Sequence, residues 1–279
     1  MSKISSLSFF YRLDNHGAAR WEQKIRKWLT SKYPRLKIGV KKPDALLVLG
    51  GDGTILEAAR LCQKTRSIIV GLNLGTVGFL SSVRDERQFL HALEKLLSGD
   101  FQVIERTMIA AQVVRKGKTV FRTTALNEIA VLNPLGMVEI EVKIGGQAVQ
   151  YIHGTGALVA TATGSTAYNL SLHGPIVLPG LSALVLTEIS DHNIPTPPVV
   201  FSDQKQISFR ILNFRERGLL SVTATGQTAE VLLVSDGEVI FPLNAKDEVK
   251  VTRSGAGIVF AEFEKNQFLK SLQEKFAFK

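Results

Sequence analysis

Five residues near the start of the chain have the composition of an anion-binding loop that also carries an acid. They are Gly50-Gly51-Asp52-Gly53-Thr54, and they follow the unbroken apolar run 45–49. Glycines let a ligand approach the backbone closely, and the free N–H groups at a helix start favour an anion. An acid beside an anion site needs a reason, such as binding a metal ion that bridges phosphates or receiving the proton of an attacking hydroxyl. The loop therefore indicates phosphate chemistry, with Asp52 as its candidate catalytic group.

A second turn, rich in small and hydroxyl residues, follows another apolar run at 157–160. It reads Thr161-Ala162-Thr163-Gly164-Ser165-Thr166-Ala167-Tyr168. Ser165 or Thr166 can cap a short helix through Tyr168, so that hydroxyls and backbone N–H groups converge on one spot. Small side chains there would let a flat ring or a sugar lie against the backbone, although an ordinary capped turn accounts for the same residues. The Gly-x-Ser-x-Gly sequence of a hydrolase nucleophile is absent, which argues against that role for Ser165.

An Asn-Glu pair, Asn127 and Glu128, stands in the apolar stretch 126–131 between the two turns. An Asn side chain offers a donor and an acceptor to a ribose hydroxyl or a base edge, and a Glu carboxylate accepts from a sugar hydroxyl or an amine. The pair is equally consistent with polar residues on a solvated sheet face. The chain contains neither a Gly-x-x-x-x-Gly-Lys-Ser/Thr loop nor a Gly-x-Gly-x-x-Gly fingerprint, and its histidines show no zinc spacing.

The elements that must position these groups are of two kinds along the chain. Up to about residue 100, buried strands alternate with amphipathic helices, which predicts a doubly wound, mostly parallel sheet. Strands are expected at 7–12, 36–40, 45–49 and 67–72, and helices at 18–33, from Thr54 onward and at 89–97. Thr54 and Glu57 have the spacing of a capping box, so the helix after the glycine loop is expected to start at Thr54. Ligands of such sheets bind at the carboxyl ends of the strands, where the loops after Leu49 and Leu72 lie.

From about residue 101 to 252 the pattern changes to short strands separated by turns, which predicts an antiparallel β domain. Strands are expected at 102–104, 109–114, 138–144, 182–188, 206–211 and 229–234. The chain ends in a helix whose apolar residues, Phe268, Leu269, Leu272 and Phe276, share one face. We expect that helix to return to the N-terminal domain. The predicted domains are thus an α/β domain over 1–100, completed by the helix at 260–279, and a β-rich domain over 101–259.

The composition is that of an ordinary globular protein. The chain has 279 residues, of which 45% are hydrophobic and 21% charged. No apolar stretch reaches the roughly 18 to 20 residues of a membrane span, and the N-terminus lacks a signal peptide, so we expect a cytoplasmic protein without a membrane partner. The single cysteine, Cys62, fits a reducing compartment. The net charge of +9 suits phosphorylated ligands, and the absence of RNA-binding or zinc-finger motifs argues against nucleic acid.

Taken together, these motifs resemble those of the NAD kinase family, and the resemblance covers most of the chain. Besides the three motifs above, it is carried by 73–80 (Asn73-Leu74-Gly75-Thr76-Val77-Gly78-Phe79-Leu80), Glu105-Arg106, 174–177 and Asp236-Gly237. Each motif alone is weak, whereas the order and spacing of all of them are specific. The resemblance implies transfer of a phosphoryl group from ATP or another donor to the 2′-hydroxyl of the adenosine ribose of NAD, giving NADP.

The resemblance also implies roles for individual residues. Asp52 would take or orient the proton of the 2′-hydroxyl, Gly53 would lie beside the diphosphate, Phe79 against the adenine, and Asn127 and Glu128 on ribose and base. The other implied binding residues of substrate or nucleotide are Gly51, Thr54, Asn73, Thr155, Thr163, Ser165, Thr166, Ala167, Tyr168 and Asp236. Mg²⁺ or another divalent cation would be held mainly by the donor phosphates, with Asp52 as a further ligand and no dedicated metal site. ATP or polyphosphate would be the donor, and the β-rich domain of a homodimer or homotetramer would bind NAD.

Three positions depart from the family pattern, and two other functions remain open. Thr155, Ala162 and Glu238 stand where the family usually has Asp, Pro and Gln. The change at Thr155 leaves the affinity for substrate and the choice between NAD and NADH open. A lipid kinase of the diacylglycerol or sphingosine type shares the glycine loop and the two-domain plan. Such kinases tend to have Gly-Thr-x-Asn-Asp after the next strand, whereas this chain has the sequence 75–80 quoted above. A non-catalytic nucleotide sensor would fit the missing carboxylate at Thr155, whereas the presence of Asp52 argues for catalysis.

Overall fold

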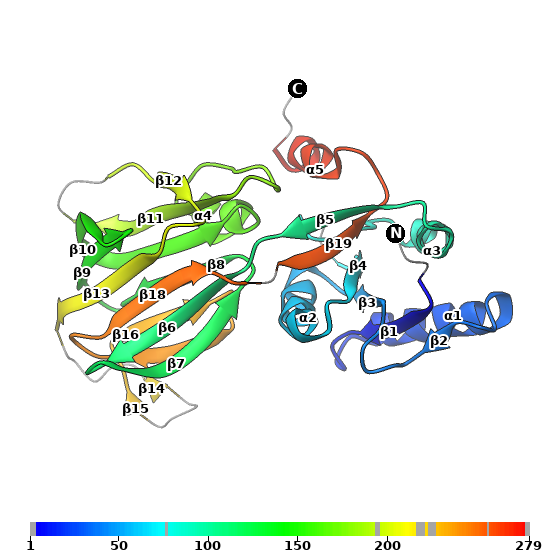
Figure 1. The fold of residues 1–279 in the computed structure, drawn as a ribbon, viewed down its shortest axis with the longest axis horizontal. Coiled ribbons are helices and arrows are strands. Elements are labelled where there is room, and N and C mark those ends of the chain that lie inside the picture. Colours follow the sequence, from blue (N-terminus) through cyan, green and yellow to red (C-terminus); the bar gives the residue numbers. More distant parts are fainter. Residues whose placement is uncertain are drawn as a thin grey trace. The chain divides into compact units, whose positions relative to one another are not determined.

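The computed structural model describes residues 4–75, 78–192, 196–215, 221–222, 227–255 and 257–276. The chain divides into two compact units (Figure 1): residues 1–106 with 257–279 form the first, and residues 107–256 form the second. The last described helix belongs to the first unit, which confirms that it returns to the N-terminal part of the chain. None of the described helices has both the length and the apolar composition that a membrane crossing requires.

The first unit is built on a six-stranded sheet in the order β2-β1-β3-β4-β19-β5. Its strands are β1 (Ser6–Phe10), β2 (Lys37–Ile38), β3 (Ala45–Leu49), β4 (Ile68–Leu72), β5 (Gln102–Arg106) and β19 (Ile258–Glu262). Its helices are α1 (His16–Lys32), α2 (Asp52–Thr65), the short 3₁₀ helix η1 (Glu86–Gln88), α3 (Phe89–Ser98) and α5 (Gln267–Phe276). All neighbouring strands are parallel except β5, which runs antiparallel to β19.

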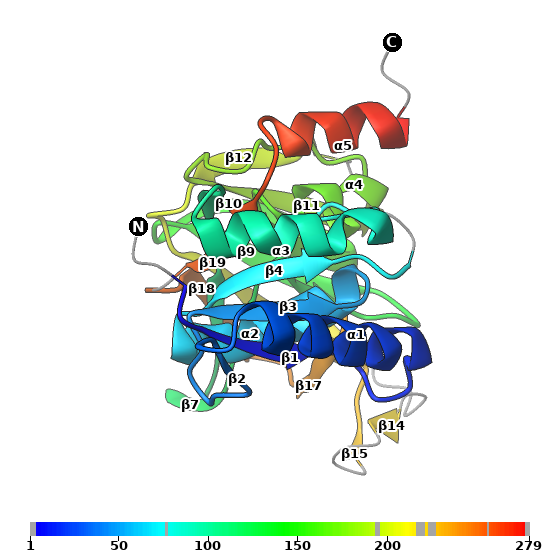
Figure 2. The same ribbon diagram turned by 90° about the vertical axis from the view of Figure 1, so that its right-hand side faces the viewer.

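Helices cover both faces of this sheet. Apolar residues of α1 and α3 share one core with β1, β3 and β4, and Figure 2 shows these two helices over the same face. Figure 1 shows α2 on the opposite face. The central strand β3 is covered on both sides, and Leu47, Val48 and Leu49 are 0% exposed, as its unbroken apolar sequence predicts. Because β3 and β4 are parallel, the loops that follow Leu49 and Leu72 leave the sheet at the same edge.

One strand pairs elsewhere than its local sequence suggested. The segment expected as a strand at 102–104 is β5, and it completes the first sheet instead of joining the antiparallel strands that follow it. Its partner is β19, where Phe260 pairs with Ile104 and Ile258 with Arg106. β19 was not among the strands predicted from the sequence, although the run 258–261 is apolar. The pairing joins residues more than 150 positions apart, so no local pattern reports it.

The second unit is an antiparallel sheet of eleven strands. They are β6 (Ile109–Arg115), β7 (Lys118–Ala125), β8 (Glu128–Leu132), β9 (Val138–Ile144), β10 (Gln147–Thr161), β11 (Ala183–Asp191), β12 (Val199–Ser202), β13 (Ile207–Phe214), β16 (Val231–Ser235), β17 (Val239–Leu243) and β18 (Glu248–Arg253). Two short helices, η2 (Gly164–Thr166) and α4 (Tyr168–Ser171), follow β10, and β14 (Ser221–Val222) pairs with β15 (Gln227–Thr228). The predicted fold class, an α/β domain followed by a β-rich domain, is confirmed.

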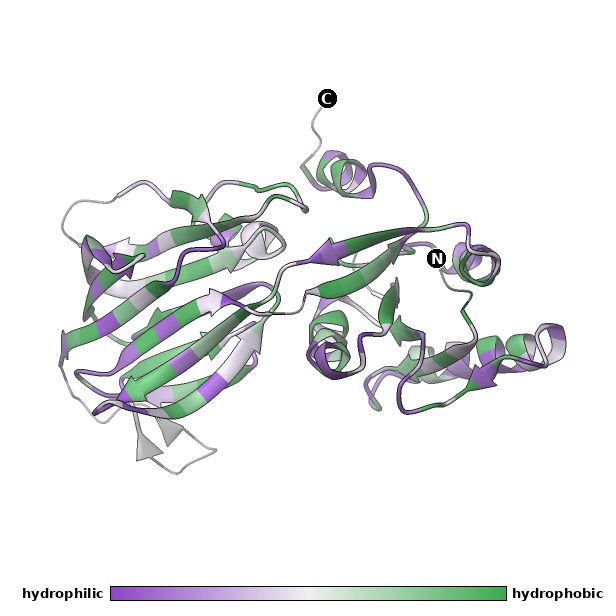
Figure 3. Cartoon of the chain, viewed as in Figure 1, coloured by the Kyte–Doolittle hydropathy of each residue, from purple (hydrophilic) through white to green (hydrophobic). Residues whose placement is uncertain are grey.

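The large sheet curls around its main apolar core, and a smaller apolar cluster that includes Ala130, Leu158 and Val185 is separate from it. Figure 3 shows hydrophobic and hydrophilic residues alternating along its strands, as expected when one face is buried. The main path of the sheet runs β17-β16-β8-β10-β9-β13-β18-β6-β7. Phe121 on β7 stacks on Phe241 on β17 with ring centroids 4.3 Å apart, so the two ends of this path meet.

Candidate active site

Asp52 is the first residue of α2, with Gly51 as the N-cap and no side-chain capping bond. The prediction of a capping box and a helix start at Thr54 is therefore wrong. Thr54 lies inside the first turn, only 7% exposed, and packs against the loop backbone. A Cβ added to Gly50 would lie 2.5 Å from its Oγ1, so this close approach requires the glycine. A carboxylate in the first turn is favoured by the positive end of the helix dipole.

The Asp52 carboxylate is held by the backbone of the loop after β4. Its Oδ2 accepts a hydrogen bond from the N–H of Phe79 at 2.9 Å, and its Oδ1 accepts one from the N–H of Leu80 at 3.3 Å. A Cβ added to Gly78 would lie 2.0 Å from Oδ1 of Asp52, so the carboxylate rests directly on that glycine. Two carboxylate oxygens offer about four acceptor positions, which leaves room for a hydroxyl group or a metal ion.

The two loops at this sheet edge are also bonded to each other. The N–H of Gly50 donates to the carbonyl of Leu72 at 3.1 Å, and the N–H of Leu74 donates to the carbonyl of Gly50 at 3.4 Å. Asn73 is 3% exposed and its Nδ2 donates to the carbonyl of Gly75 at 2.8 Å. Its Oδ1 is buried without a hydrogen-bond partner. The structure therefore brings Gly51, Asp52, Gly53, Thr54 and Asn73 together, as their predicted place at the carboxyl ends of the strands requires.

Phe79 turns its ring toward the C-terminal helix. It is 8% exposed, and its ring centroid lies 5.7 Å from that of Phe268 and 6.3 Å from that of Phe276. The Nζ of Lys275 lies 4.7 Å from the same ring. The contact of Phe79 with adenine stays a prediction. Thr76 and Val77, which belong to the same motif, lie outside the described residues.

Arg106 is a charged neighbour of Asp52 whose role could not be predicted from the sequence. It is 5% exposed, its guanidinium lies 5.1 Å from the ring of Phe260, and its Nη2 is 3.7 Å from Oε1 of Glu262. Burial lowers its pKa, and the charges of Glu262 and Asp52 oppose that shift. Since an arginine keeps its proton in proteins, a buried positive charge accompanies Asp52. The only signal in the sequence was the Glu105-Arg106 motif, which does not predict that Arg106 lies near Asp52.

In the second unit, three strand ends meet because their strands are antiparallel. Glu128 begins β8, and it pairs with Ala160 near the end of β10. Ser235 ends β16 and pairs with Ile129 of β8. The Asn-Glu pair, the turn after β10 and Asp236 therefore lie at one end of the sheet, although Asn127 and Asp236 are 109 positions apart in sequence.

Asp236 ties these strand ends together. Its carboxylate accepts from the backbone N–H groups of Leu126 at 3.0 Å, Asn127 at 2.7 Å and Glu128 at 3.3 Å. It is 6% exposed and adopts a left-handed φ of 48°. Asp236 therefore fixes the backbone of the Asn-Glu pair, a role that the sequence did not reveal.

Glu128 is a buried acid with one free oxygen. It is 7% exposed, and the N–H of Tyr168 donates to its carboxylate. Its Oε2 is buried without a hydrogen-bond partner. Burial first, and then the charge of Asp236, raise the pKa of Glu128 to about 8, which the Tyr168 bond opposes. Near neutral pH this side chain is largely protonated, so it offers both a donor and an acceptor. An unsatisfied buried oxygen marks a position where a ligand group would bond.

The turn after β10 is held by its own hydroxyl groups. The predicted cap by Ser165 or Thr166 is wrong, because Ala167 is the N-cap of α4 and no side chain caps it. Ser165 is 0% exposed; its Oγ lies 2.7 Å from the carbonyl of Ala162 and accepts from the N–H of Val177 at 2.9 Å. Thr166 donates to the carbonyl of Thr163 at 3.2 Å. These internal bonds fix the turn while Tyr168 stays 38% exposed.

The turn also lies tightly against the Asn-Glu pair. A Cβ added to Gly164 would lie 2.1 Å from the carbonyl oxygen of Asn127, so only glycine fits there. The N–H of Thr161 donates to that same carbonyl at 2.8 Å. The turn is therefore in direct contact with the pair, through Gly164 at Asn127 and through Tyr168 at Glu128.

Thr155 is the predicted site residue that this unit does not bring to the others. It lies on β10 beside Gly156, which pairs with Leu132, whereas Glu128 pairs with Ala160. Four residues of strand separate these two pairs, roughly 13 Å at the usual rise per residue. Thr155 is half-buried, and its carbonyl accepts from the N–H of Asn133 at 2.8 Å.

The chain matches family models along most of its length. Residues 11–101 match the ATP-NAD kinase N-terminal domain, and residues 126–263 match the ATP-NAD kinase C-terminal domain. An NAD kinase of Heliobacterium modesticaldum is 32% identical over 254 residues, which are 90% of this chain and 85% of the relative. An NAD kinase of Moorella thermoacetica is 36% identical over 234 residues, which are 83% of this chain and 70% of the relative.

Two solved structures share the fold. Yeast NADH kinase complexed with NADH aligns with a TM-score of 0.88 at 20% identity, over 100% of this chain and 89% of that one. An NAD kinase from Archaeoglobus fulgidus in complex with ATP aligns with a TM-score of 0.70 at 24% identity, over 98% of this chain and 97% of that one. At these identities the likeness is one of fold.

Proposed function

The chain belongs to the NAD kinase family, and on this premise we propose which of its residues carry the phosphoryl transfer. It is a phosphotransferase, and the family predicted from the sequence is confirmed. The relatives give no support to a lipid kinase or to a non-catalytic sensor. The roles below are argued from the surroundings of each residue.

We propose that Asp52 receives the proton of the attacking hydroxyl. The observation that carries this assignment is the carboxylate at the start of α2, held by the N–H groups of Phe79 and Leu80 with acceptor positions left over. The 2′-hydroxyl oxygen of the adenosine ribose forms a bond to the terminal phosphorus of the donor. The bond from that phosphorus to the leaving phosphate breaks, and the hydroxyl proton passes to Asp52. The glycine backbone and the start of α2 favour the negative charge of the diphosphate.

In the second unit, we propose that Asn127 and Glu128 bind the ribose and the base of NAD. Glu128 has a buried oxygen without a partner and a pKa of about 8, which suits a carboxyl group that donates to one ligand atom and accepts from another. Thr163, Thr166, Ala167 and Tyr168 would line the nucleoside. Ser165 and Asp236 would act by holding the turn and the Asn-Glu backbone, because their side chains are bonded to the chain itself.

We propose ATP as the phosphoryl donor, with a divalent cation. Two findings support this choice: both matching family domains are ATP-NAD kinase domains, and the Archaeoglobus enzyme was solved in complex with ATP. Among the described residues, no three His, Cys, Asp or Glu side chains come together as a metal site. The chemistry of Asp52 fits Mg²⁺, which typically binds through one or two carboxylates together with substrate phosphates. When bound, the ion would neutralise charge on the donor phosphates.

A cytoplasmic location and a homodimeric or homotetrameric state complete the proposal. Cys62 is a free, buried thiol whose pKa burial raises to about 11, so it stays reduced and unreactive as expected in a reducing compartment. Sedimentation of the purified chain would give the oligomeric state directly.

A donor and acceptor panel tests the proposed function. Purified protein is incubated with NAD or NADH, with ATP or polyphosphate, and with Mg²⁺ present or removed by EDTA. We expect NADP from NAD, ATP and Mg²⁺, loss of product with EDTA, and recovery when Mg²⁺ is added back. NADP formed without any divalent ion would contradict the proposed metal requirement, and NADP formed from polyphosphate alone would contradict ATP as the donor. Phosphorylation of a lipid but not of NAD would contradict the proposed function itself.

A further inference from the structure

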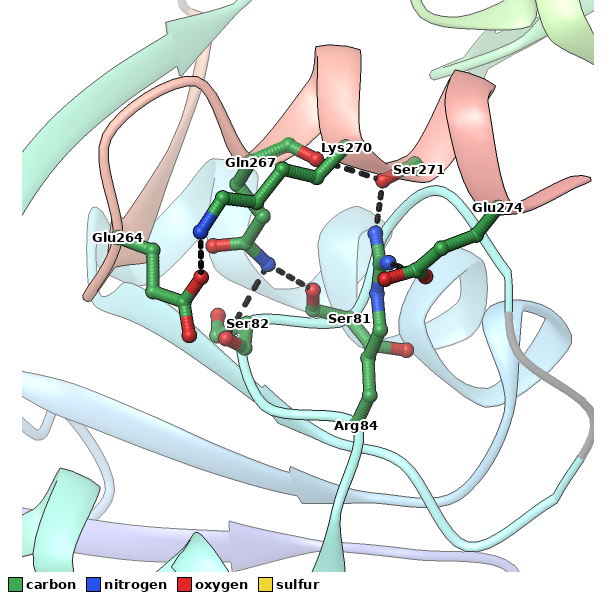
Figure 4. A network of polar contacts seen from close by, with 8 residues as sticks. All are labelled: Ser81, Ser82, Arg84, Glu264, Gln267, Lys270, Ser271 and Glu274. Carbon is green, nitrogen blue, oxygen red and sulfur yellow. Dashed lines mark hydrogen bonds and ion pairs between the residues drawn. The ribbon is translucent and has the colours of Figure 1, made fainter. Parts of the chain in front are cut away.

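The loop that holds Asp52 is itself bonded to the C-terminal helix. Figure 4 shows α5 lying along the segment 81–84, which directly follows the two residues that donate to Asp52. The side-chain Nε2 of Gln267 donates to the carbonyl of Ser81 at 2.6 Å and to that of Ser82 at 3.1 Å. Since both partners are carbonyl oxygens, which only accept, the amide nitrogen must face them. One side chain of α5 therefore fixes two consecutive peptide groups of this loop.

Two further contacts join α5 to the same loop. The guanidinium of Arg84 bonds to the hydroxyl of Ser271 and, at 2.5 Å, to the carboxylate of Glu274 (Figure 4). The ring of Phe79 lies against Phe268, which is 9% exposed. Phe79 also supplies the shorter of the two N–H bonds to Asp52, at 2.9 Å. The residue that aims the carboxylate is thus anchored on α5 by its own side chain.

The other side of the loop is fixed to the end of β4. The N–H groups of Ser82 and Val83 donate to the carbonyl of Gly71 at 2.8 and 2.9 Å, and Ser82 Oγ accepts from the N–H of Gly71 at 3.1 Å. The loop therefore lies between the sheet and α5. A cavity of about 210 Å³ lined by residues 82–85, α3 and α5 lies beside it, so α5 does not close completely against α3. The position of α5 consequently depends more on its contacts with the loop than on contacts with α3.

We propose that α5 positions the catalytic carboxylate, with Gln267 and Phe268 as positioning residues of the reaction. By fixing the carbonyls of Ser81 and Ser82 and the ring of Phe79, they keep the N–H groups of residues 79 and 80 aligned with Asp52. This inference rests on the proposed role of Asp52. A carboxylate that is misplaced by a fraction of an ångström transfers protons less well although the substrates still bind.

Variants at Gln267 test the proposal without truncating the helix. In Gln267→Glu the shape is kept, but a carboxylate replaces the donor and faces two carbonyl oxygens. We expect kcat to fall about tenfold, with KM for NAD and for ATP unchanged within about twofold. Gln267→Lys restores a donor and should recover most of the lost kcat. The matched control is Lys270→Gln, which breaks the exposed ion pair with Glu264 on the same helix and should leave kcat unchanged.

The results separate this inference from the function on which it rests. Asp52→Asn is assayed in parallel, and if it keeps wild-type activity, the role of Asp52 and this proposal both fail. If Asp52→Asn is inactive while Gln267→Glu has wild-type kcat, the positioning role alone is overturned. It is also overturned if Gln267→Glu loses kcat only together with a raised KM and a lowered Tm, or if Gln267→Lys does not recover activity, because general loosening of α5 would explain both.

Discussion

Asp52 in the first unit and Glu128 in the second are each the first residue of a secondary-structure element, α2 and β8, yet the charges near their carboxyl groups have opposite signs. Asp52 accepts two backbone N–H bonds at the start of a helix, and the positive charge of Arg106 is close enough to interact with it. Glu128 is buried, accepts from one N–H, and lies near the negative charge of Asp236, so its pKa rises to about 8. The first setting suits a group that receives a proton, and the second a group that keeps one. The comparison shows that the role of a carboxyl group follows from its neighbours.

Among changes to the surroundings of the two carboxyl groups, the largest effect is expected where the carboxylate of Asp52 is displaced sterically. In Gly78→Ala the added methyl would lie 2.0 Å from Oδ1 of Asp52, so the carboxylate must move off its N–H donors. We expect kcat for NADP formation to fall about 100-fold, measured in steady-state assays at saturating NAD and ATP. Gly75→Ala is the matched control, because a Cβ there would meet nothing within 4 Å. Equal activity of the two variants would show that the placement of Asp52 does not limit the reaction.

The second setting predicts a pH dependence of stability. Folded Glu128 keeps its proton up to about pH 8, whereas in the unfolded chain it ionises near its ordinary value of 4.5. Between these values the folded state binds more protons, so stability falls as pH rises. The loss between pH 6 and 8 should be about 2 kcal/mol. Urea unfolding of the wild type and of Glu128→Gln at several pH values between 6 and 8 measures this loss of unfolding free energy. The loss due to Glu128 should be absent from the variant. Identical profiles would show that Glu128 is not the group responsible.

The smallest effect is expected when the negative charge near Glu128 is removed by a substitution at Asp236. Asp236→Asn keeps the shape and tolerates the left-handed φ, but it puts an amide N–H₂ toward backbone donors. We expect a loss of about 1.5 kcal/mol in unfolding free energy by urea titration. The pH dependence due to Glu128 should also move to lower pH, since one cause of its raised pKa is gone. Unchanged stability together with an unchanged pH dependence would show that Asp236 neither holds this turn nor raises the pKa of Glu128.

Local sequence patterns were sufficient for much of the fold. The apolar run 45–49 predicted β3, with the same bounds, and 138–144 predicted β9. The capping box failed because the carboxylate of Asp52 accepts from Phe79 and Leu80, 27 and 28 residues away, and this contact helps to set where α2 begins. Such a contact leaves no periodic signal in the sequence around Thr54.

The residues that form each site were easier to predict than the hydrogen bonds that hold them. Asp52 could be named as an acid in a glycine loop and Glu128 as a polar residue in an apolar stretch, and the resemblance implied their roles. The sequence did not predict that the carboxylate of Asp236 accepts hydrogen bonds from three backbone N–H groups. It also did not predict that Gln267 bonds to the loop at Ser81. These contacts join strands and loops that only the fold brings together, so they cannot be predicted from the types of the residues alone.

The assignment of Asp52 as proton acceptor is tested most directly by single-turnover formation of NADP. The wild type and Asp52→Asn are mixed with NAD, ATP and Mg²⁺, with enzyme in excess, and NAD binding to each is measured by calorimetry. The account predicts that the rate of NADP formation falls about 1,000-fold in Asp52→Asn while its Kd for NAD stays within about threefold. A variant that forms NADP at a rate close to that of the wild type would contradict it.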